Sequence, residues 1–206
     1  GYGGVRNSFG TDLAILCQLE IDRKTVLISD KSWSASQEGP LGLNDLMQGE
    51  CYDARKENIC EWHPVTEKQF GYENLVCSNS FDVVEKENFT GKQIHTPNGE
   101  VVIDFGQNIA GYVKFGFYAQ AGQCITLYHG ECLDQNGNFT QENFQAPEHR
   151  VEQCVKYICK EGWNEYKPEK SIFGFRYIKA ITDVKVTEKN FTAIAVYSDM
   201  PQTGKF

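Results

Sequence analysis

YVKFGFY, residues 112–118, is the stretch that decides the fold class. Val113, Phe115 and Phe117 fall at every second position, so their side chains share one face of an extended strand. The residues between them share the other face. A strand with one apolar face buries that face between two sheets and exposes the other. The pattern therefore predicts a half-buried strand of a β-sandwich.

The same kind of run recurs along the chain. We expect strands at Leu13–Ile21, Thr25–Ile28, Val101–Phe105, Tyr112–Ala119, Cys124–His129, Val151–Cys159, Phe175–Thr182 and Phe191–Tyr197. Turn signals separate them at residues 22–24, 97–99, 106–108, 121–123 and 136–138. No window shows a sustained period of 3.6 residues, so we predict an all-β fold of the sandwich type.

Two regions are less regular. Residues 37–52 carry several glycines and a proline and are expected to be irregular, with one helical turn at most over Leu43–Met47. Residues 62–92 are polar and weakly patterned. We place a domain boundary near residue 80, between an irregular first half and a regular second half.

Composition excludes several classes of function. The chain has 206 residues and a formal net charge of −8, and it contains no basic run, so we expect no nucleic-acid partner. No apolar stretch approaches the roughly 20 residues that span a bilayer, so we expect no membrane partner. The eight cysteines form no C-x-x-C pair, and we expect reduced, structural thiols.

Six short motifs resemble segments of bacterial α-L-rhamnosidases (glycoside hydrolase family 78). They are SWSAS with Gly39-Pro40 and GECYDAR at residues 49–55, then DFGQN at 104–108 with Gly111, HGE at 129–131 with Leu133-Asp134 and Gly137, GFRY at 174–177, and SDMP at 198–201 with Thr203-Gly204 and Phe206. Their order and spacing make the resemblance specific, and it covers nearly the whole chain. The chain departs from the family at Phe173, where many relatives carry His, and over residues 146–154.

The resemblance implies a domain plan. Residues 1–80 would be the C-terminal part of an incomplete N-terminal β-sandwich. Residues 81–200 would form a jelly-roll or concanavalin-like β-sandwich, and residues 201–206 a linker toward an absent catalytic (α/α)6 barrel. That barrel is the expected partner, within the same parent chain. A bacterial cytoplasmic location is expected rather than secretion, because no leader is visible at the start.

The resemblance also implies the function. The parent would hydrolyse terminal α-L-rhamnose from glycosides with inversion, and this fragment alone would be inactive because the catalytic acids belong to the barrel. The fragment would brace the barrel and line its substrate cleft. Two alternatives stay open: an independent module that binds rhamnose or a related sugar, and a small enzyme in its own right.

Several polar residues are candidates for contact with substrate. Asp104, Gln107 and Asn108 are expected on a turn after a strand, either facing a cleft or satisfying their own backbone. His129 and Glu131 lie two residues apart, with Glu142 beyond them. Inverting hydrolysis needs two carboxyl groups about 6.5–9.5 Å apart. The plainer interpretation makes Glu131 a solvated strand residue, and we expect no catalytic residue here.

A second acidic cluster contains Asn44, Asp45, Glu50 and Asp53. Oxygen ligands of this kind suit calcium, which can also grip sugar hydroxyls, with Trp33 or Tyr52 as an apolar platform. The alternative has Asp53 paired with Arg55 and Glu50 facing solvent.

Residues 134–138 place oxygen ligands at alternate positions, as at the start of a calcium loop. The position of the Asn136-Gly137 pair favours a hairpin turn instead. We therefore expect no cofactor, and calcium is the single candidate that the sequence offers.

Overall fold

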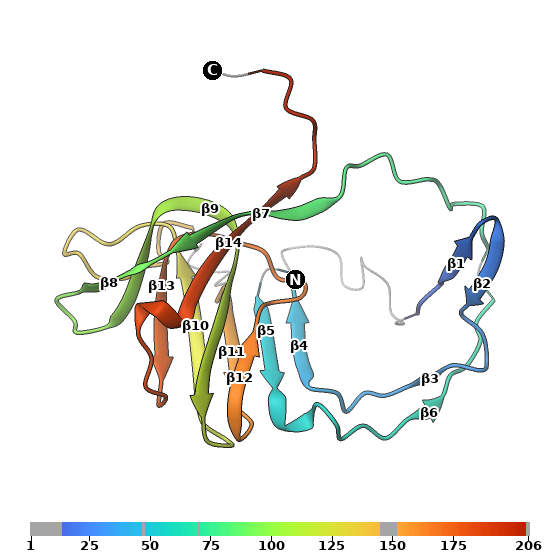
Figure 1. The fold of residues 1–206 in the computed structure, drawn as a ribbon, viewed down its shortest axis with the longest axis horizontal. Coiled ribbons are helices and arrows are strands. Elements are labelled where there is room, and N and C mark those ends of the chain that lie inside the picture. The colour runs from blue at the N-terminus through green and yellow to red at the C-terminus, as the bar shows by residue number, and fades with distance from the viewer. Residues whose placement is uncertain (1–13, 47, 70, 145–151, 205–206) are drawn as a thin grey trace. The chain divides into compact units, whose positions relative to one another are not determined.

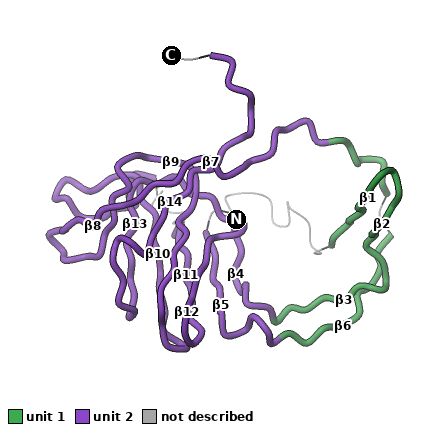
Figure 2. Tube along the Cα trace, viewed as in Figure 1, with its two compact units in different colours: residues 1–38, 60–77 green, residues 39–59, 78–206 purple. Residues whose placement is uncertain are grey.

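The computed structural model describes residues 14–46, 48–69, 71–144 and 152–204. The chain divides into two compact units, residues 1–38 with 60–77 (unit 1) and residues 39–59 with 78–206 (unit 2), as Figure 2 shows. Strands account for nearly all of the regular structure (Figure 1). Over the described ranges, no helix has the length and apolar character needed to cross a membrane.

Unit 1 contains two small antiparallel pairs. Strands β1 (Gln18–Ile21) and β2 (Lys24–Ile28) form a hairpin around Asp22 and Arg23, which both have positive φ. Strands β3 (Ser34–Ala35) and β6 (His63–Pro64) form the second pair. All the buried apolar residues in the described part of the chain belong to unit 2, so unit 1 contributes none of the core.

Unit 2 is built on one ten-stranded sheet. Its strands are β4 (Leu41–Asp45), β5 (Gly49–Asp53), β7 (Val83–Thr90), β8 (Lys92–His95), β9 (Val101–Ala119), β10 (Cys124–Gly130), β11 (Cys154–Ile158), β12 (Gly162–Tyr166), β13 (Phe173–Thr182) and β14 (Phe191–Ser198). Two 3-10 turns, η1 (Ala54–Lys56) and η2 (Glu188–Asn190), complete it. The strand order is β4-β5-β11-β10-β13-β9-β14-β7, with β8 and β12 also paired to β9.

The sheet curls around one core, which gives the predicted all-β sandwich (Figure 1). The long strand β9 makes this possible, because its first half pairs with β8 and β13 and its second half with β12 and β14. Val113, Phe115 and Phe117 are buried on one face of β9, as their alternation predicted. The core also takes aromatic side chains from β11 and β13, including Tyr157 and Phe175.

Three of the six strands expected in the second half are confirmed within two residues at both ends: Cys124–His129, Phe175–Thr182 and Phe191–Tyr197. Residues 106–108 are a correction: we expected a turn there, but β9 runs through them without a break. Gly106 has φ +81°, and the pairing register between β13 and β9 shifts opposite it, between Phe175 and Tyr177. A bulge therefore bends the strand without ending it.

The prediction of a helical turn over Leu43–Met47 is wrong for the residues that the structure describes, and Met47 lies outside them. Leu41–Asp45 forms strand β4 and pairs antiparallel with β5. β5 in turn pairs in parallel with β11, which lies a hundred residues further along the chain. Long-range pairing overrides the weak local preference of this glycine-rich stretch.

Seven strands were not predicted: β3, β4, β5, β6, β7, β8 and β12. β7 lies at the end of the sheet, and most of its side chains are exposed, so its apolar alternation is weak. The domain limits at residues 80 and 200 were inferred from the family resemblance, whereas units 1 and 2 are defined by compactness. The two limits therefore stay a prediction.

Candidate functional site

A bidentate ion pair joins two of the sequence motifs. Arg176 Nε donates to Asp104 Oδ1 and Arg176 Nη2 donates to Asp104 Oδ2, each at 2.8 Å. Asp104 Oδ1 also accepts from the Gly106 amide at 2.6 Å. The bulge in β9 thus brings the aspartate of DFGQN to the arginine of GFRY. We call Asp104, Arg176 and Glu131, whose carboxylate lies by Gly174 two residues before Arg176, the Arg176 cluster.

The ion pair lies at the surface rather than in the core. The side chains of Arg176 and Asp104 are 39% and 20% exposed. The hydrogen bonds from Arg176 hold the pKa of Asp104 below its usual value, and Asp104 raises the pKa of Arg176 in return. The guanidinium also lies over the Tyr177 ring, 4.9 Å from its centroid. A fixed, partly exposed guanidinium of this kind can donate hydrogen bonds to a ligand hydroxyl or carboxylate.

Glu131 lies beside the same strand. β10 ends at Gly130, so Glu131 follows the strand and is partly buried, whereas we expected a solvated strand residue. Asn143 Nδ2 donates to Glu131 Oε2 at 2.9 Å. Glu131 Oε1 lies 3.1 Å from the point where a Cβ on Gly174 would stand, so the glycine leaves room for the carboxylate. Glu142 is exposed, and its amide donates to the Thr140 hydroxyl.

His129 is in the core. Its ring is fully buried, stacks on Phe173 with 4.2 Å between centroids, and meets Phe175 edge-on. Nδ1 lies 3.0 Å from the Gln153 carbonyl oxygen, whereas Nε2 has no hydrogen-bond partner in the described part of the chain. Burial lowers the pKa of His129 to about 4. His129 is thus a neutral packing residue at pH 7 and does not meet a ligand arriving from solvent.

Gln107 and Asn108 are exposed on β9, within the bulge between Asp104 and Ile109. Of the five predicted substrate-contact residues, the structure therefore leaves four at the surface and places His129 beneath them. Sequence reasoning missed Arg176 as a site residue. An arginine in GFRY with no acidic residue beside it was a signal that its partner lay elsewhere in the chain.

The predicted calcium cluster is dispersed. Glu50 is 1% exposed, so the expectation that it faces solvent is wrong. Its carboxylate accepts from Tyr166 Oη at 2.6 Å and from the amides of Glu169, Lys170 and Ser171 at 3.2, 2.8 and 2.8 Å. These four donors satisfy the charge without a metal ion.

The other members of that cluster are engaged separately. Asp53 makes the expected ion pair with Arg55 at 2.8 Å, Asp45 accepts from the Gln48 amide at 2.7 Å, and Asn44 is exposed. Across the described ranges, no three His, Cys, Asp or Glu side chains group as metal ligands. At the 134–138 turn, Asp134 Oδ1 accepts from the amides of Asn136 and Asn138, which supports the hairpin interpretation.

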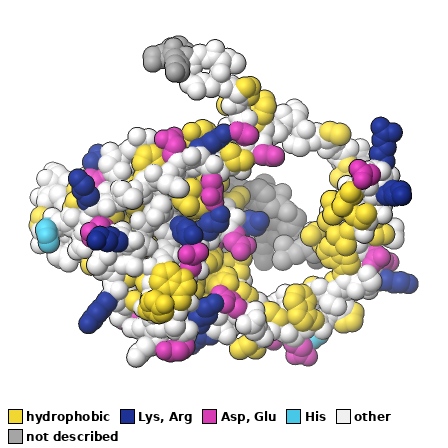
Figure 3. All heavy atoms as spheres, in the orientation of Figure 1, with side chains coloured by type: hydrophobic (Ala, Val, Ile, Leu, Met, Phe, Trp, Pro, Cys, Tyr) yellow, Lys and Arg dark blue, Asp and Glu magenta, His cyan; other side chains and the backbone are white. Residues whose placement is uncertain are grey.

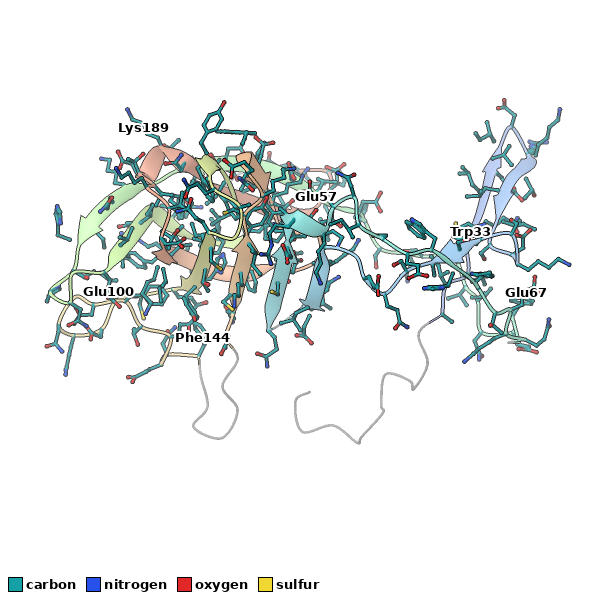
Figure 4. All side chains as sticks on the ribbon, turned by 90° about the horizontal axis from the view of Figure 1, so that it is seen from below. Trp33, Glu57, Glu67, Glu100, Phe144 and Lys189 are labelled. Atoms are coloured by element: carbon teal, nitrogen blue, oxygen red, sulfur yellow. The ribbon has the colours of Figure 1, made fainter. Side chains whose placement is uncertain are left out.

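The two proposed sugar platforms lie in different units. Tyr52 is packed against Tyr157 and Tyr166, and its hydroxyl donates to Glu57 at 3.3 Å. Trp33 lines a cavity of about 910 Å³ within unit 1, together with Glu67 and Tyr72. Figure 4 labels Trp33 and Glu67. All eight cysteines are free thiols.

Two family models match the chain. The model described as the bacterial α-L-rhamnosidase concanavalin-like domain matches residues 94–197, and the α-L-rhamnosidase N-terminal domain matches residues 1–94. The chain belongs to the bacterial α-L-rhamnosidase family. Both edge strands of the unit 2 sheet, β4 and β7, come from the part that matches the N-terminal domain.

Relatives of this α-L-rhamnosidase region are much longer proteins. An α-L-rhamnosidase of Formosa agariphila is 29% identical over 193 residues, which cover 86% of this chain and 20% of the relative. One from Streptomyces avermitilis is 26% identical and is matched over 97% of this chain and 21% of its own length. The chain thus spans about one fifth of the relatives it matches.

Solved structures of two α-L-rhamnosidases are similar to this chain over most of its length. The native α-L-rhamnosidase of Aspergillus terreus superposes with a TM-score of 0.79 at 28% identity, covering 97% of this chain and 25% of that one. The Streptomyces avermitilis enzyme complexed with L-rhamnose gives a TM-score of 0.75 at 26% identity, covering 90% of this chain and 19% of that one.

Proposed function

We propose that this chain is the accessory β-sandwich region of an α-L-rhamnosidase that hydrolyses terminal α-L-rhamnose from glycosides with inversion. The observation that carries the proposal is the pair of family matches, which together cover residues 1–197. The shared length is about one fifth of the relatives, so the bond-breaking carboxylates would lie in the remaining part, on the expected catalytic barrel. The chain alone would be inactive.

We further propose that the Arg176 cluster faces the barrel and lines the rim of its substrate cleft. The cluster supplies a fixed guanidinium and a carboxylate bound on one oxygen by Asn143, and the exposed side-chain amides of Gln107 and Asn108 on β9 add further polar groups that a sugar rim needs. We assign the bracing role to the face that carries the Arg176 cluster. Polar groups fixed on rigid strands would hold the neighbouring barrel in one orientation.

The full-length parent tests this proposal. Glu131→Gln should raise KM for an aryl α-L-rhamnoside several-fold while leaving kcat within about threefold, because a rim residue contributes binding rather than bond cleavage. Glu142→Gln, at an exposed residue outside the cluster, is the control and should change neither KM nor kcat. Complete loss of kcat in Glu131→Gln would make Glu131 catalytic and overturn the assignment. Hydrolysis by the isolated chain would refute its accessory role.

The bacterial cytoplasmic location expected from the sequence is likewise a proposal. Eight free thiols fit a reducing compartment. Fractionation of the source cells, with an antibody against this region, would contradict it by finding the protein outside the cell.

A further inference from the structure

An exposed aromatic pair lies on the outer face of β9 and β12. Tyr118 and Trp163 are cross-strand partners and are 76% and 49% exposed. Their ring centroids are 5.1 Å apart and the planes meet at 64°. A Cβ on Gly116 would stand 2.9 Å from Trp163 Cζ2, so the absence of a side chain there lets the indole rest on the strand. The two rings therefore form a fixed edge-to-face pair that faces solvent, which we call the apolar corner.

Paired charges continue the same face along β9. Lys114 Nζ lies 3.0 Å from Glu165 Oε1, and both side chains are about half exposed. Further along, Glu85 accepts from Tyr112 Oη at 2.7 Å and forms an ion pair with Lys167. Figure 3 shows a hydrophobic group over the ends of β9 and β12, with basic and acidic side chains in line above it. We call this surface the β9 stripe; its members are Glu85, Tyr112, Lys114, Gly116, Tyr118, Trp163, Glu165 and Lys167.

The far end of the β9 stripe is hollowed. A cavity of about 330 Å³ lies there within unit 2, lined by Glu85 and Tyr112 with Val83, Val196 and Ser171. The six-residue step along β9 from Tyr112 to Tyr118 spans about 20 Å at the usual rise of a strand. The stripe therefore offers an apolar corner at one end, a hollow lined by both polar and apolar side chains at the other, and paired charges between them.

We propose that the β9 stripe binds a neutral sugar chain, the part of the glycoside that precedes the rhamnose removed by the parent enzyme. An aromatic ring can pack against the C–H face of a pyranose, whereas paired Lys and Glu side chains hydrogen-bond to hydroxyls without requiring a charged ligand. This inference rests on the proposed function, and it assigns a neutral sugar ligand to the β9 stripe, a surface separate from the Arg176 cluster.

Binding to the intact chain tests the proposal, with neutral hexasaccharides of rhamnan, cellulose, mannan and xylan as probes and a hexagalacturonate as the charged comparison. Isothermal titration should show binding of at least one neutral probe and weaker binding of the charged one. Trp163→Ala and Tyr118→Ala should each weaken it about tenfold, the effect of removing one aromatic anchor. Trp163→Phe should retain most of the affinity.

Trp62→Ala is the matched control, because Trp62 is 65% exposed in unit 1 and lies outside the stripe. Its affinity should equal that of the wild-type chain, and circular dichroism should confirm that every variant is folded. The proposal is overturned if no neutral hexasaccharide binds with a Kd below about 10 mM, or if Trp62→Ala weakens binding as much as Trp163→Ala. Hydrolysis of an aryl rhamnoside by the full-length enzyme is measured separately, so a failure here leaves the proposed function standing.

Discussion

Glu50 shows how one residue can hold distant segments together. It lies on β5, and its carboxylate takes four hydrogen bonds from residues 166–171, more than a hundred positions away. Such bonds to a charged group are worth roughly 1.5–3 kcal/mol each in mutational studies, and the effects are not additive.

Replacing Glu50 should therefore destabilise unit 2. Glu50→Ala leaves three amides and a hydroxyl without an acceptor and should cost about 3 kcal/mol or more of unfolding free energy. Glu50→Gln should cost less, because its oxygen still accepts. Chemical denaturation followed by near-ultraviolet circular dichroism measures both. Glu165→Gln, in an exposed ion pair, is the control and should change stability by less than about 1 kcal/mol.

His129 makes stability depend on pH. Its pKa is about 4 in the folded chain, below the ordinary histidine value of 6.5 that applies once the chain is unfolded. Between these values the unfolded chain binds the extra proton, so stability is full above pH 6.5 and falls as the pH drops toward 4. His129→Phe removes this proton uptake and should flatten the slope of unfolding free energy between pH 6.5 and 4. An identical slope in the variant and the wild-type chain would show that other groups cause it.

At the scale of elements, the crossing of β9 and β14 depends on a glycine. Gly111 pairs with Ala195, and a Cβ there would lie 1.9 Å from the Ile194 carbonyl oxygen. Backbone atoms on both strands must then move. Gly111→Ala should cost about 2–3 kcal/mol, or prevent folding, as overpacking of a rigid core does. Gly39→Ala has open space around the added atom and should be nearly neutral. A neutral Gly111→Ala in thermal unfolding would contradict the close approach.

The bulge at Gly106 belongs to the same scale. Without the extra residues in β9 between Asp104 and Ile109, Asp104 would not align with Arg176, and the two motifs would lie on neighbouring strands without contact. Bulges are common at functional sites because they redirect side chains in this way. The Arg176 cluster is thus a product of strand pairing rather than of either motif alone.

At the scale of the whole molecule, unit 2 draws strands from both family domains. β4, β5 and β7 lie in the part that matches the N-terminal domain, yet they form both ends of the sheet built mainly by the concanavalin-like domain. β5 also carries Glu50. The two sequence families therefore share one hydrogen-bonded sheet and one core.

A chain that begins at residue 94 should consequently fail to fold cooperatively. It exposes the edges of β11 and β14 and leaves the amides of residues 169–171 without Glu50. A chain of residues 39–206, which retains all of unit 2, is the control and should unfold in a single transition. Dispersed amide resonances in the shorter chain, with an undiminished melting temperature, would show instead that the concanavalin-like domain is autonomous.

Local sequence determined the strands whose two faces differ. The alternation of Val113, Phe115 and Phe117 and the turn signals at Gly99, Gly122 and Gly137 predicted their structures correctly, because they depend on near neighbours. The family motifs likewise identified the region from the chain alone. Tertiary structure decided the rest: that Leu41–Asp45 is a strand, that Glu50 and His129 are buried, and that Asp104 meets Arg176. Each of these features depends on segments that lie far apart in the sequence. Whether a side chain is buried or forms an ion pair is determined by the residues that the folded chain places next to it.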